Sequence, residues 1–286
     1  MIAYLTDVAI DQFIEQALKE DIGPGDYTSL AAIPENAQST AQLLIKENGI
    51  LAGITLAGYI FKAVDAKLDI TAFKNDGDPV IYGDVVLKVS GKAQSILMAE
   101  RLVLNCMQRM SGIATTTHRL NKIIEPYKAR LLDTRKTTPN FRLMEKWAVK
   151  IGGGFNHRFA LYDMIMIKDN HIDFAGGITA AIEATKRYLK QNHLDLNIEI
   201  ETRNIDEVKE VISVGGVNQI MLDNMSPQMM KLAVSLIGGK YSVEASGGIT
   251  EENIGSVAAS GVDFISVGAL THSVKSLDMS LKATKG

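Results

Sequence analysis

Cysteine is almost absent from the sequence. Cys106 is the only cysteine among 286 residues. A single thiol cannot form an intrachain disulfide, and it cannot supply a cysteine-based zinc site. The scarcity of cysteine therefore excludes a disulfide-stabilised fold and indicates a reducing compartment.

The chain also lacks an excess of positive charge and a long apolar run. Thirty Lys and Arg residues are balanced by 33 Asp and Glu residues, for a net charge of −3. Nucleic acids and anionic membranes usually bind a basic face, so we expect neither as a partner. Residues 1–21 carry charges among their apolar positions, unlike a signal peptide, and no run approaches the roughly 18 residues of a membrane span. We predict a cytoplasmic protein.

The first 112 residues have the pattern of a small α+β domain. An amphipathic helix begins near Asp7, which we expect to cap it, and strand-like stretches separated by glycine turns follow between about 39 and 92. Residues 93–110 contain no Gly or Pro and predict a long helix that leads to the second part of the chain. The last residues, 275–286, alternate apolar and polar positions and are expected to return to this domain as a strand.

Residues 113–274 contain six short apolar runs that each end in charge, glycine or hydroxyl. They are LLDTRK (131–136), MIMIKDN (164–170), IEIET (198–202), IMLDN (220–224), VEASGG (243–248) and ISVGALTH (265–272). Helical stretches separate them, which predicts a parallel sheet, either closed into a barrel or open and doubly wound. The last four strand ends lie 22 residues apart, which favours a barrel, and no GxGxxG follows a strand. Because barrels carry reactive groups at the C-terminal ends of their strands, this pattern predicts an enzyme.

Cationic side chains gather at the early strand ends and their loops. They are Arg135, Lys136, His157, Arg158, Lys168 and His171. Any one of them could belong to a solvated surface, but guanidinium forks match carboxylates and phosphates, so the set predicts a small polyanionic substrate.

Two acids, Glu201 and Asp223, end adjacent predicted strands. Two carboxylates facing a phosphate-rich pocket are costly unless a hard cation lies between them, and Mg²⁺ commonly uses one or two carboxylates with substrate phosphates. Pairing of each acid with a neighbouring Arg or Lys is the alternative. Both interpretations place the acids in the site.

The late strand ends are rich in glycine. Ser246, Gly247 and Gly248 follow one strand, and Gly268 follows the next. Late strand ends of barrels commonly bind phosphate through backbone N–H groups, so we expect a phosphate there.

Lys168 allows a second enzyme class. A lysine that ends an apolar run could be desolvated enough to form a Schiff base, as in barrel aldolases. Borohydride trapping of a substrate on Lys168 would reveal this chemistry, although the cations around it favour charge pairing.

At these residues the sequence resembles the quinolinate phosphoribosyltransferase family. The matching segments occur in family order: EDIGPGDYTS (20–29), ERLVLNCMQRMSGIAT (100–115), DTRKTTPNFR (133–142), GGGFNHRFAL (152–161), MIKDNHI (166–172), EIET (199–202), LDN (222–224), EASGGI (244–249) and GVDFISVGALTHS (261–273). Asn140 stands where the family often has glycine, and asparagine tolerates the same left-handed backbone region. The resemblance spans nearly the whole chain.

The resemblance implies an incomplete α/β barrel with a smaller N-terminal α+β sandwich domain. It also implies a reaction, in which phosphoribosyl pyrophosphate and quinolinate give nicotinate mononucleotide, pyrophosphate and CO₂ for NAD biosynthesis. The implied catalytic residues are Lys136, Lys168, Glu201 and Asp223, and the two acids are the implied Mg²⁺ ligands. The implied substrate-binding residues are Arg101, Arg135, His157, Arg158, Lys168, Ser246, Gly247, Gly248, Gly268 and His272.

The resemblance further implies a homo-oligomer, a dimer or a hexamer, in which Arg101 reaches the site of a neighbouring subunit. Two alternatives within this fold stay open. One is a related paralogue associated with molybdenum transport, which shares many of the motifs, and the other is a catalytically silent anion-binding protein.

Overall fold

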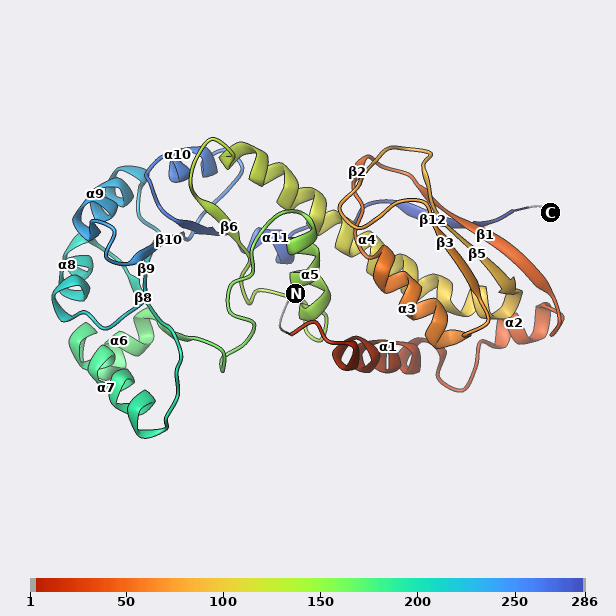
Figure 1. The fold of residues 1–286 in the computed structure, drawn as a ribbon, viewed down its shortest axis with the longest axis horizontal. Helices are drawn as coiled ribbons and strands as arrows, with labels where there is room; N and C mark the ends of the chain where they lie inside the picture. Colours follow the sequence, from red (N-terminus) through yellow and green to blue (C-terminus); the bar gives the residue numbers. More distant parts are fainter. Residues whose placement is uncertain (1–3, 285–286) are drawn as a thin grey trace. The chain divides into compact units, whose positions relative to one another are not determined.

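The computed structural model describes residues 4–284, which form two compact units. Unit 1 contains the chain up to His118, residues 137–153 and the stretch that begins at Ala269. Unit 2 contains Arg119–Lys136 and Gly154–Gly268. Unit 1 is built on an antiparallel sheet and unit 2 on a parallel sheet (Figure 1), so the predicted α/β fold class is confirmed.

The main sheet of unit 1 has four strands in the order β12-β1-β5-β3. These strands are β1 (Gln38–Ile45), β3 (Asp69–Ala72), β5 (Val85–Lys92) and β12 (Met279–Ala283). Ala41, Leu43 and Ile45 alternate along β1 and are buried, because side chains two residues apart share one face of a strand. β12 pairs antiparallel with β1, so the last strand of the chain lies beside the first. β2 (Gly49–Ile50) and β4 (Pro79–Val80) form a separate two-stranded ladder.

The helices of unit 1 are α1 (Asp7–Ile22), α2 (Tyr27–Ala32), α3 (Ile54–Val64), the first part of α4 (Ala93–Ile124), α5 (Arg142–Ile151) and α11 (Ala269–His272). The prediction that Asp7 caps the first helix was wrong. The cap is Thr6, whose hydroxyl accepts from the Ala9 N–H at 3.2 Å, and Asp7 is the first helical residue. Its carboxylate there still favours the positive end of the helix dipole.

Helix α4 extends well beyond the 93–110 stretch predicted for it. It passes through Gly112, where a Cβ atom would collide with the backbone carbonyl of Lys275. A glycine usually disfavours a helix interior, but here close approach of the C-terminal segment requires one.

A buried ion pair joins three separate stretches of unit 1. The Arg109 guanidinium donates from Nε and Nη2 to Glu145 Oε1 of α5 at 3.1 and 2.8 Å. Glu145, which has no exposed surface, also accepts from the Thr138 N–H and hydroxyl at 3.0 and 2.9 Å. Arg109 donates in addition to the carbonyl oxygens of Thr271 and Val274. These bonds connect α4 to residues 137–153 and to the C-terminal stretch.

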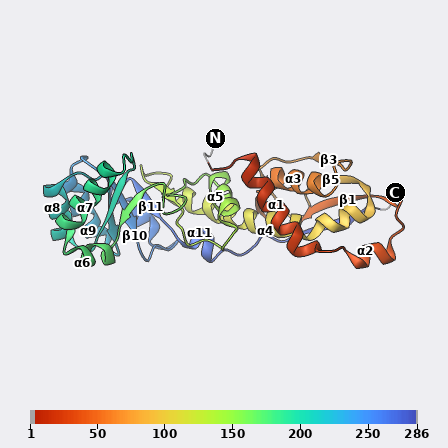
Figure 2. The ribbon, with the colours of Figure 1, turned by 90° about the horizontal axis from the view of Figure 1, so that it is seen from below.

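Unit 2 is a six-stranded parallel sheet in the order β6-β11-β10-β9-β8-β7, and the incomplete barrel of parallel strands is confirmed. The strands are β6 (Arg130–Leu132), β7 (Ile165–Ile167), β8 (Ile198–Thr202), β9 (Gln219–Asp223), β10 (Ser242–Ser246) and β11 (Phe264–Ser266). The helices are α6 (Asp169–Ala175), α7 (Ile178–Gln191), α8 (Ile205–Val214), α9 (Pro227–Ile237) and α10 (Ile254–Ala258). Helices α7 to α9 lie along the outer side of the sheet (Figures 1 and 2).

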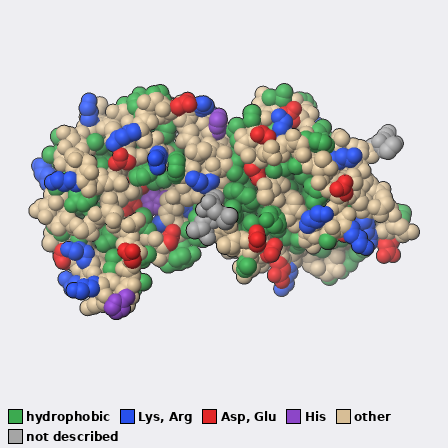
Figure 3. All heavy atoms as spheres, in the orientation of Figure 1, with side chains coloured by type: hydrophobic (Ala, Val, Ile, Leu, Met, Phe, Trp, Pro, Cys, Tyr) green, Lys and Arg blue, Asp and Glu red, His purple; other side chains and the backbone are tan. Residues whose placement is uncertain are grey.

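The surface has no concentration of one charge on the face drawn in Figure 3. Lys and Arg side chains are scattered there among Asp and Glu, in keeping with the small net charge. Among residues 4–284, no helix is both long enough and apolar enough to cross a membrane.

Candidate active site

The parallel register of unit 2 places the polar strand ends at one edge of the sheet. Glu201 of β8 is level with Met221 of β9, and Asp223 of β9 is level with Ser246 of β10. Side chains two residues apart share a face, so Glu201 and Asp223 belong to the same side of neighbouring strands. The sheet therefore brings together the acids and Ser246 as the sequence predicted.

Lys168 and Glu201 form an ion pair at this edge. Lys168 follows β7 and caps α6, and its Nζ lies 3.2 Å from Glu201 Oε2. Burial raises the pKa of Glu201, the Lys168 ammonium opposes this, and the charge of Asp223 raises the pKa further. Asp223 accepts at 2.7 Å from the side-chain amide of Asn224. Two acids that repel each other beside one ammonium form a site that a further cation would stabilise.

Arg135 and Arg158 form a second group of charges. Burial lowers the pKa of Arg158, and the nearby positive charge of Arg135 lowers it further. Arg158 donates from Nη1 to the Met164 carbonyl at 3.1 Å, whereas the buried Nε of Arg135 has no hydrogen-bond partner. Two guanidinium groups near each other, one with an unused donor, are suited to an anion with several negative charges.

The loop that carries Arg158 is fixed at the end of β6. Asp133, which is fully buried, accepts from the His157 N–H at 2.8 Å and from the Asn156 side chain at 2.5 Å. The Phe155 N–H donates to the Leu131 carbonyl at 2.8 Å. The loop therefore presents Arg158 from an ordered base.

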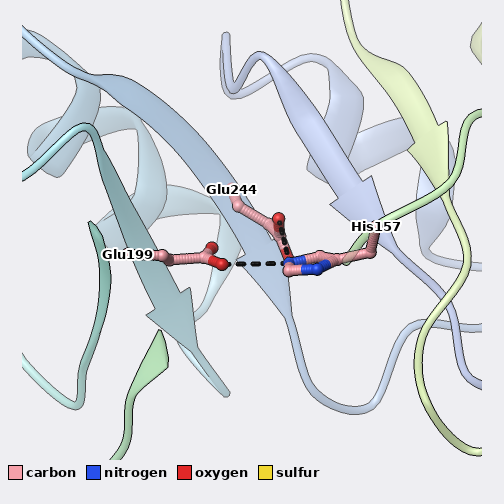
Figure 4. Close-up of side chains that lie close together, drawn as sticks. All are labelled: His157, Glu199 and Glu244. Atoms are coloured by element: carbon pink, nitrogen blue, oxygen red, sulfur yellow. Dashed lines mark hydrogen bonds and ion pairs between the residues drawn. The ribbon is translucent and has the colours of Figure 1, made fainter. Parts of the chain in front are cut away.

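His157, which the resemblance implied as a substrate ligand, has a nearly buried side chain. Its side chain is 7% exposed, and Nε2 lies 2.9 Å from Glu199 Oε2 and 3.4 Å from Glu244 Oε2 (Figure 4). Gln219 donates to both of these carboxylates, at 2.8 and 2.7 Å. His157 therefore contacts Glu199 and Glu244, and Gln219 links these two acids. None of the three was predicted as a site residue from the sequence.

Alternation along the strands could have revealed the two acids, Glu199 and Glu244. Glu199 precedes Glu201 by two positions on β8, and Glu244 precedes Ser246 by two on β10. The strict period of two places each on the same face as a predicted site residue. Both acids stand between apolar residues, in IEI and VEA, and such runs are typical of strands that only pack in the core.

The late glycines adopt backbone conformations that only glycine takes readily. Gly247 and Gly248 have φ values of 87° and 60°. A Cβ on Gly247 would overlap the side-chain amide of Asn224. The backbone N–H of Asn224 donates to the Ser246 carbonyl at 2.9 Å. Gly268 follows β11 in the same unit. Asn140, in unit 1, has φ 61°, as expected for a substitute of glycine.

The remaining predicted site residues lie in less enclosed places. Lys136 is exposed, and its backbone N–H donates to the Thr134 hydroxyl at 3.0 Å. Arg101 and His272 belong to unit 1, on α4 and α11, and both are exposed. The His272 Nδ1 lies 2.5 Å from the Ser273 hydroxyl.

Models of a known family match almost the whole chain. Residues 26–111 match the quinolinate phosphoribosyl transferase N-terminal domain, and residues 113–282 match the C-terminal domain of the same family.

Individual proteins agree with these family models. A nicotinate-nucleotide pyrophosphorylase [carboxylating], chloroplastic, from Arabidopsis thaliana is 50% identical over 284 residues, covering 94% of this chain and 81% of that protein. A probable nicotinate-nucleotide pyrophosphorylase [carboxylating] from Bacillus subtilis is 40% identical, covering 98% and 95%. The crystal structure of NadC from Streptococcus pyogenes superimposes with a TM-score of 0.92 at 40% identity, covering 98% of each chain. The chain therefore belongs to the quinolinate phosphoribosyl transferase family.

Proposed function

We propose that this protein transfers the phosphoribosyl group of phosphoribosyl pyrophosphate to quinolinate and removes one carboxylate, giving nicotinate mononucleotide, pyrophosphate and CO₂. The observation that carries the proposal is the Arg135–Arg158 pair, in which a buried Nε has no partner and two positive charges repel each other. Quinolinate, a pyridine dicarboxylate, supplies two negative charges on adjacent ring positions. A guanidinium fork can accept such a carboxylate through two parallel hydrogen bonds.

The acid end of the site suits the second substrate. Glu201 and Asp223 lie on one face of neighbouring strands, and their charges repel. Carboxylate oxygens are the ligands that Mg²⁺ takes together with substrate phosphates, so these residues fit the ion and would hold it. When bound, Mg²⁺ would neutralise the pyrophosphate as it leaves. The glycine turn at Ser246–Gly248 offers backbone N–H groups to the phosphate.

The side chains of this chain stabilise the charges that the reaction creates. Departure of pyrophosphate leaves positive charge on the anomeric carbon of the ribose, and the carboxylates of Glu201 and Asp223 stabilise it. Lys168, paired with Glu201 at 3.2 Å, fixes the orientation of that carboxylate. The pyridine nitrogen then attacks the anomeric carbon.

Decarboxylation follows from the alkylated ring. The ring nitrogen is now cationic, so the electron pair left by departing CO₂ is stabilised beside it until a proton arrives. Arg135 and Arg158 hold the substrate through its carboxylates, and the candidates for the proton donor are Lys168 and the histidines. A lysine ammonium paired with a carboxylate is not the neutral amine that a Schiff base requires, which argues against the aldolase alternative.

We also propose that the protein is a cytoplasmic homo-oligomer in which Arg101 completes the site of a neighbouring subunit. Arg101 supports this because it is exposed on α4 of unit 1, where it is accessible to another copy. A mixture of two inactive variants, Arg101→Ala and Asp223→Ala, tests it. Recovery of activity on mixing would support shared sites, and no recovery after subunit exchange would contradict them.

The deciding experiment is an assay for nicotinate mononucleotide. Purified protein is incubated with quinolinate, phosphoribosyl pyrophosphate and Mg²⁺, and nicotinate replaces quinolinate in the control. We expect product and CO₂ from quinolinate alone. Binding of quinolinate without CO₂ release would favour the silent anion-binding protein, and a response to molybdate with no product would favour the transport-associated paralogue.

A further inference from the structure

We propose that Gln219 and Glu244 are positioning residues for the quinolinate pocket: they orient the His157 ring, and the ring orients the backbone that carries Arg158. This inference rests on the proposed function, because it assigns the role of residues beneath the same pocket. Neither residue was predicted from the sequence, and neither lies at the C-terminal end of its strand.

Gln219 is the centre of the arrangement. Its single side-chain NH₂ group donates one hydrogen to Glu199 Oε1 at 2.8 Å and the other to Glu244 Oε2 at 2.7 Å. Both donors are used, so the two carboxylates have fixed orientations. Glu199 Oε2 remains available for His157 Nε2 at 2.9 Å. Both acids are fully buried, and a hydrogen bond lost there would leave a polar group without water to replace it.

The other ring nitrogen of His157 contacts the loop. The Arg158 N–H donates to His157 Nδ1 at 2.7 Å. The two nitrogens of one ring therefore connect the strand residues below to the Arg158 backbone above. A rotation of the ring would break both contacts at once, so an oriented ring means an oriented Arg158.

The hydrogen-bond geometry indicates whether one proton of the cluster belongs to His157 or to Glu244. Burial lowers the pKa of His157, but its hydrogen bonds to Glu199 and Glu244 raise it, so the cluster holds one proton more than two carboxylates and a neutral ring would. Burial and the charge of Glu199 raise the pKa of Glu244 as well. An imidazolium with two carboxylates and a neutral imidazole with one protonated carboxyl have the same net charge of −1. Since Nδ1 accepts from the Arg158 N–H, it has no proton, and the arrangement is the neutral Nε2–H ring beside a protonated Glu244.

The burial of Glu244 fits this assignment. Its side chain is fully buried, and a neutral carboxyl group costs less there than a carboxylate.

A metal ion is the competing explanation of the cluster. One ligand atom each from His157, Glu199 and Glu244 lies within 4.8 Å of the others. Gln219 favours the hydrogen-bonded arrangement, because its N–H donors already use one oxygen of each carboxylate. The N–H groups of Gln219 and His157 donate to carboxylate oxygens of Glu199 and Glu244, so these acids have hydrogen-bond donors without a cation.

Three variants of the full-length protein test the positioning role. Gln219→Met and Glu244→Met remove the hydrogen bonds with little change in length, whereas Glu244→Gln keeps a neutral group with the same acceptor. Gln228→Met, on the exposed side of α9, makes the same chemical change away from the cluster and is the matched control. Gln219→Met loses two buried hydrogen bonds and Glu244→Met at least one, so we expect a rise of roughly tenfold or more in the KM for quinolinate in both variants. The KM for phosphoribosyl pyrophosphate should change less than about twofold, and Glu244→Gln and the control should resemble the parent protein.

Several outcomes would overturn the proposal. Unchanged quinolinate KM in both Met variants would remove the positioning role, and an equal rise in both KM values would mean that the cluster only supports the barrel. A Glu244→Gln protein as impaired as Glu244→Met would show that a charge at this position is needed. Zinc or manganese that stays bound to the parent protein after dialysis against EDTA, but is absent from Glu244→Gln, would establish the metal site instead.

One measurement needs neither a variant nor activity. Nitrogen NMR of the labelled His157 ring in the parent protein should give the neutral Nε2–H tautomer at pH 7.5, and an imidazolium signature would contradict the assignment. If the protein makes no nicotinate mononucleotide but the NMR spectrum gives the neutral tautomer, only the proposed function fails. If it makes product but the Met variants are normal, only the positioning role fails.

Discussion

Replacing Arg135 by Met should weaken quinolinate binding and stabilise the protein. The buried Nε of Arg135 has no partner, and its charge lies near that of Arg158. A buried donor without a partner costs about 1–3 kcal/mol, so removing it should stabilise the fold by about 1 kcal/mol or more. For a protein of this size such a gain corresponds to a rise in Tm of about 2–4 °C.

The same substitution removes the hydrogen bonds that the guanidinium would make to a carboxylate. Each hydrogen bond to a charged group contributes about 1.5–3 kcal/mol, so a two-bond fork is worth about 3 kcal/mol or more. At 1.4 kcal/mol per factor of ten, the Kd for quinolinate should rise by roughly 100-fold or more. Arg135→Lys keeps the charge but loses the guanidinium fork. Its Kd for quinolinate should therefore lie between those of the parent protein and Arg135→Met.

Calorimetry with quinolinate and a thermal melt of the same samples measure both effects. Arg203→Met is the control, because Arg203 is exposed and already pairs with Glu207 at 2.7 Å and Asp173 at 3.2 Å. We expect its quinolinate affinity to equal that of the parent protein. A lower Tm for Arg135→Met together with an affinity within threefold of the parent would refute the role assigned to the unpaired guanidinium.

Three further predictions concern the acid end, the glycine turn and the metal. Because burial raises the pKa of Glu201 above its ordinary value of 4.5, the folded state retains this proton more strongly than the unfolded state, and stability declines as the pH rises above that value. Glu201→Gln should therefore have a higher Tm than the parent at pH 7.5, and the difference should shrink as the pH falls towards 4.5, while the use of phosphoribosyl pyrophosphate is lost. A Tm difference independent of pH would contradict this. Gly247→Ala should destabilise the fold by about 2 kcal/mol or more because φ is 87° and the new methyl group meets Asn224, whereas Gly239→Ala, with φ 76° and open space around it, should lose only the part due to backbone strain. Urea titrations compare the two. EDTA should abolish formation of nicotinate mononucleotide and added Mg²⁺ should restore it; full activity in EDTA would remove the metal from the proposal.

The polar strand ends were predictable because each polar residue directly follows its apolar run in the sequence. Each of the six runs ends where its strand ends, and a parallel sheet brings such ends to one edge, so the grouping of Lys168, Glu201 and Asp223 followed from the pattern alone.

The cluster around His157 was not predictable in the same way. Its members come from a loop and from three strands, and they meet only because the register sets Glu199 level with Gln219 and Glu244 level with Met221. Register depends on the packing of the whole sheet, which a single run does not encode. The extent of α4 was missed for a similar reason, since the contact that requires Gly112 is with Lys275.

The pairing of β12 with β1 has a consequence for biosynthesis. β1 begins at Gln38 and its partner ends at Ala283, so the hydrogen-bonding edge of β1 that β12 covers stays open until nearly the entire chain has been synthesised. An open strand edge can pair with other chains. The Arg109 guanidinium also lacks its acceptors until residues 137–153 and the C-terminal stretch have been synthesised. Unit 1 is thus completed only after unit 2 has been synthesised, and removing residues 277–286 should convert soluble expression into aggregation.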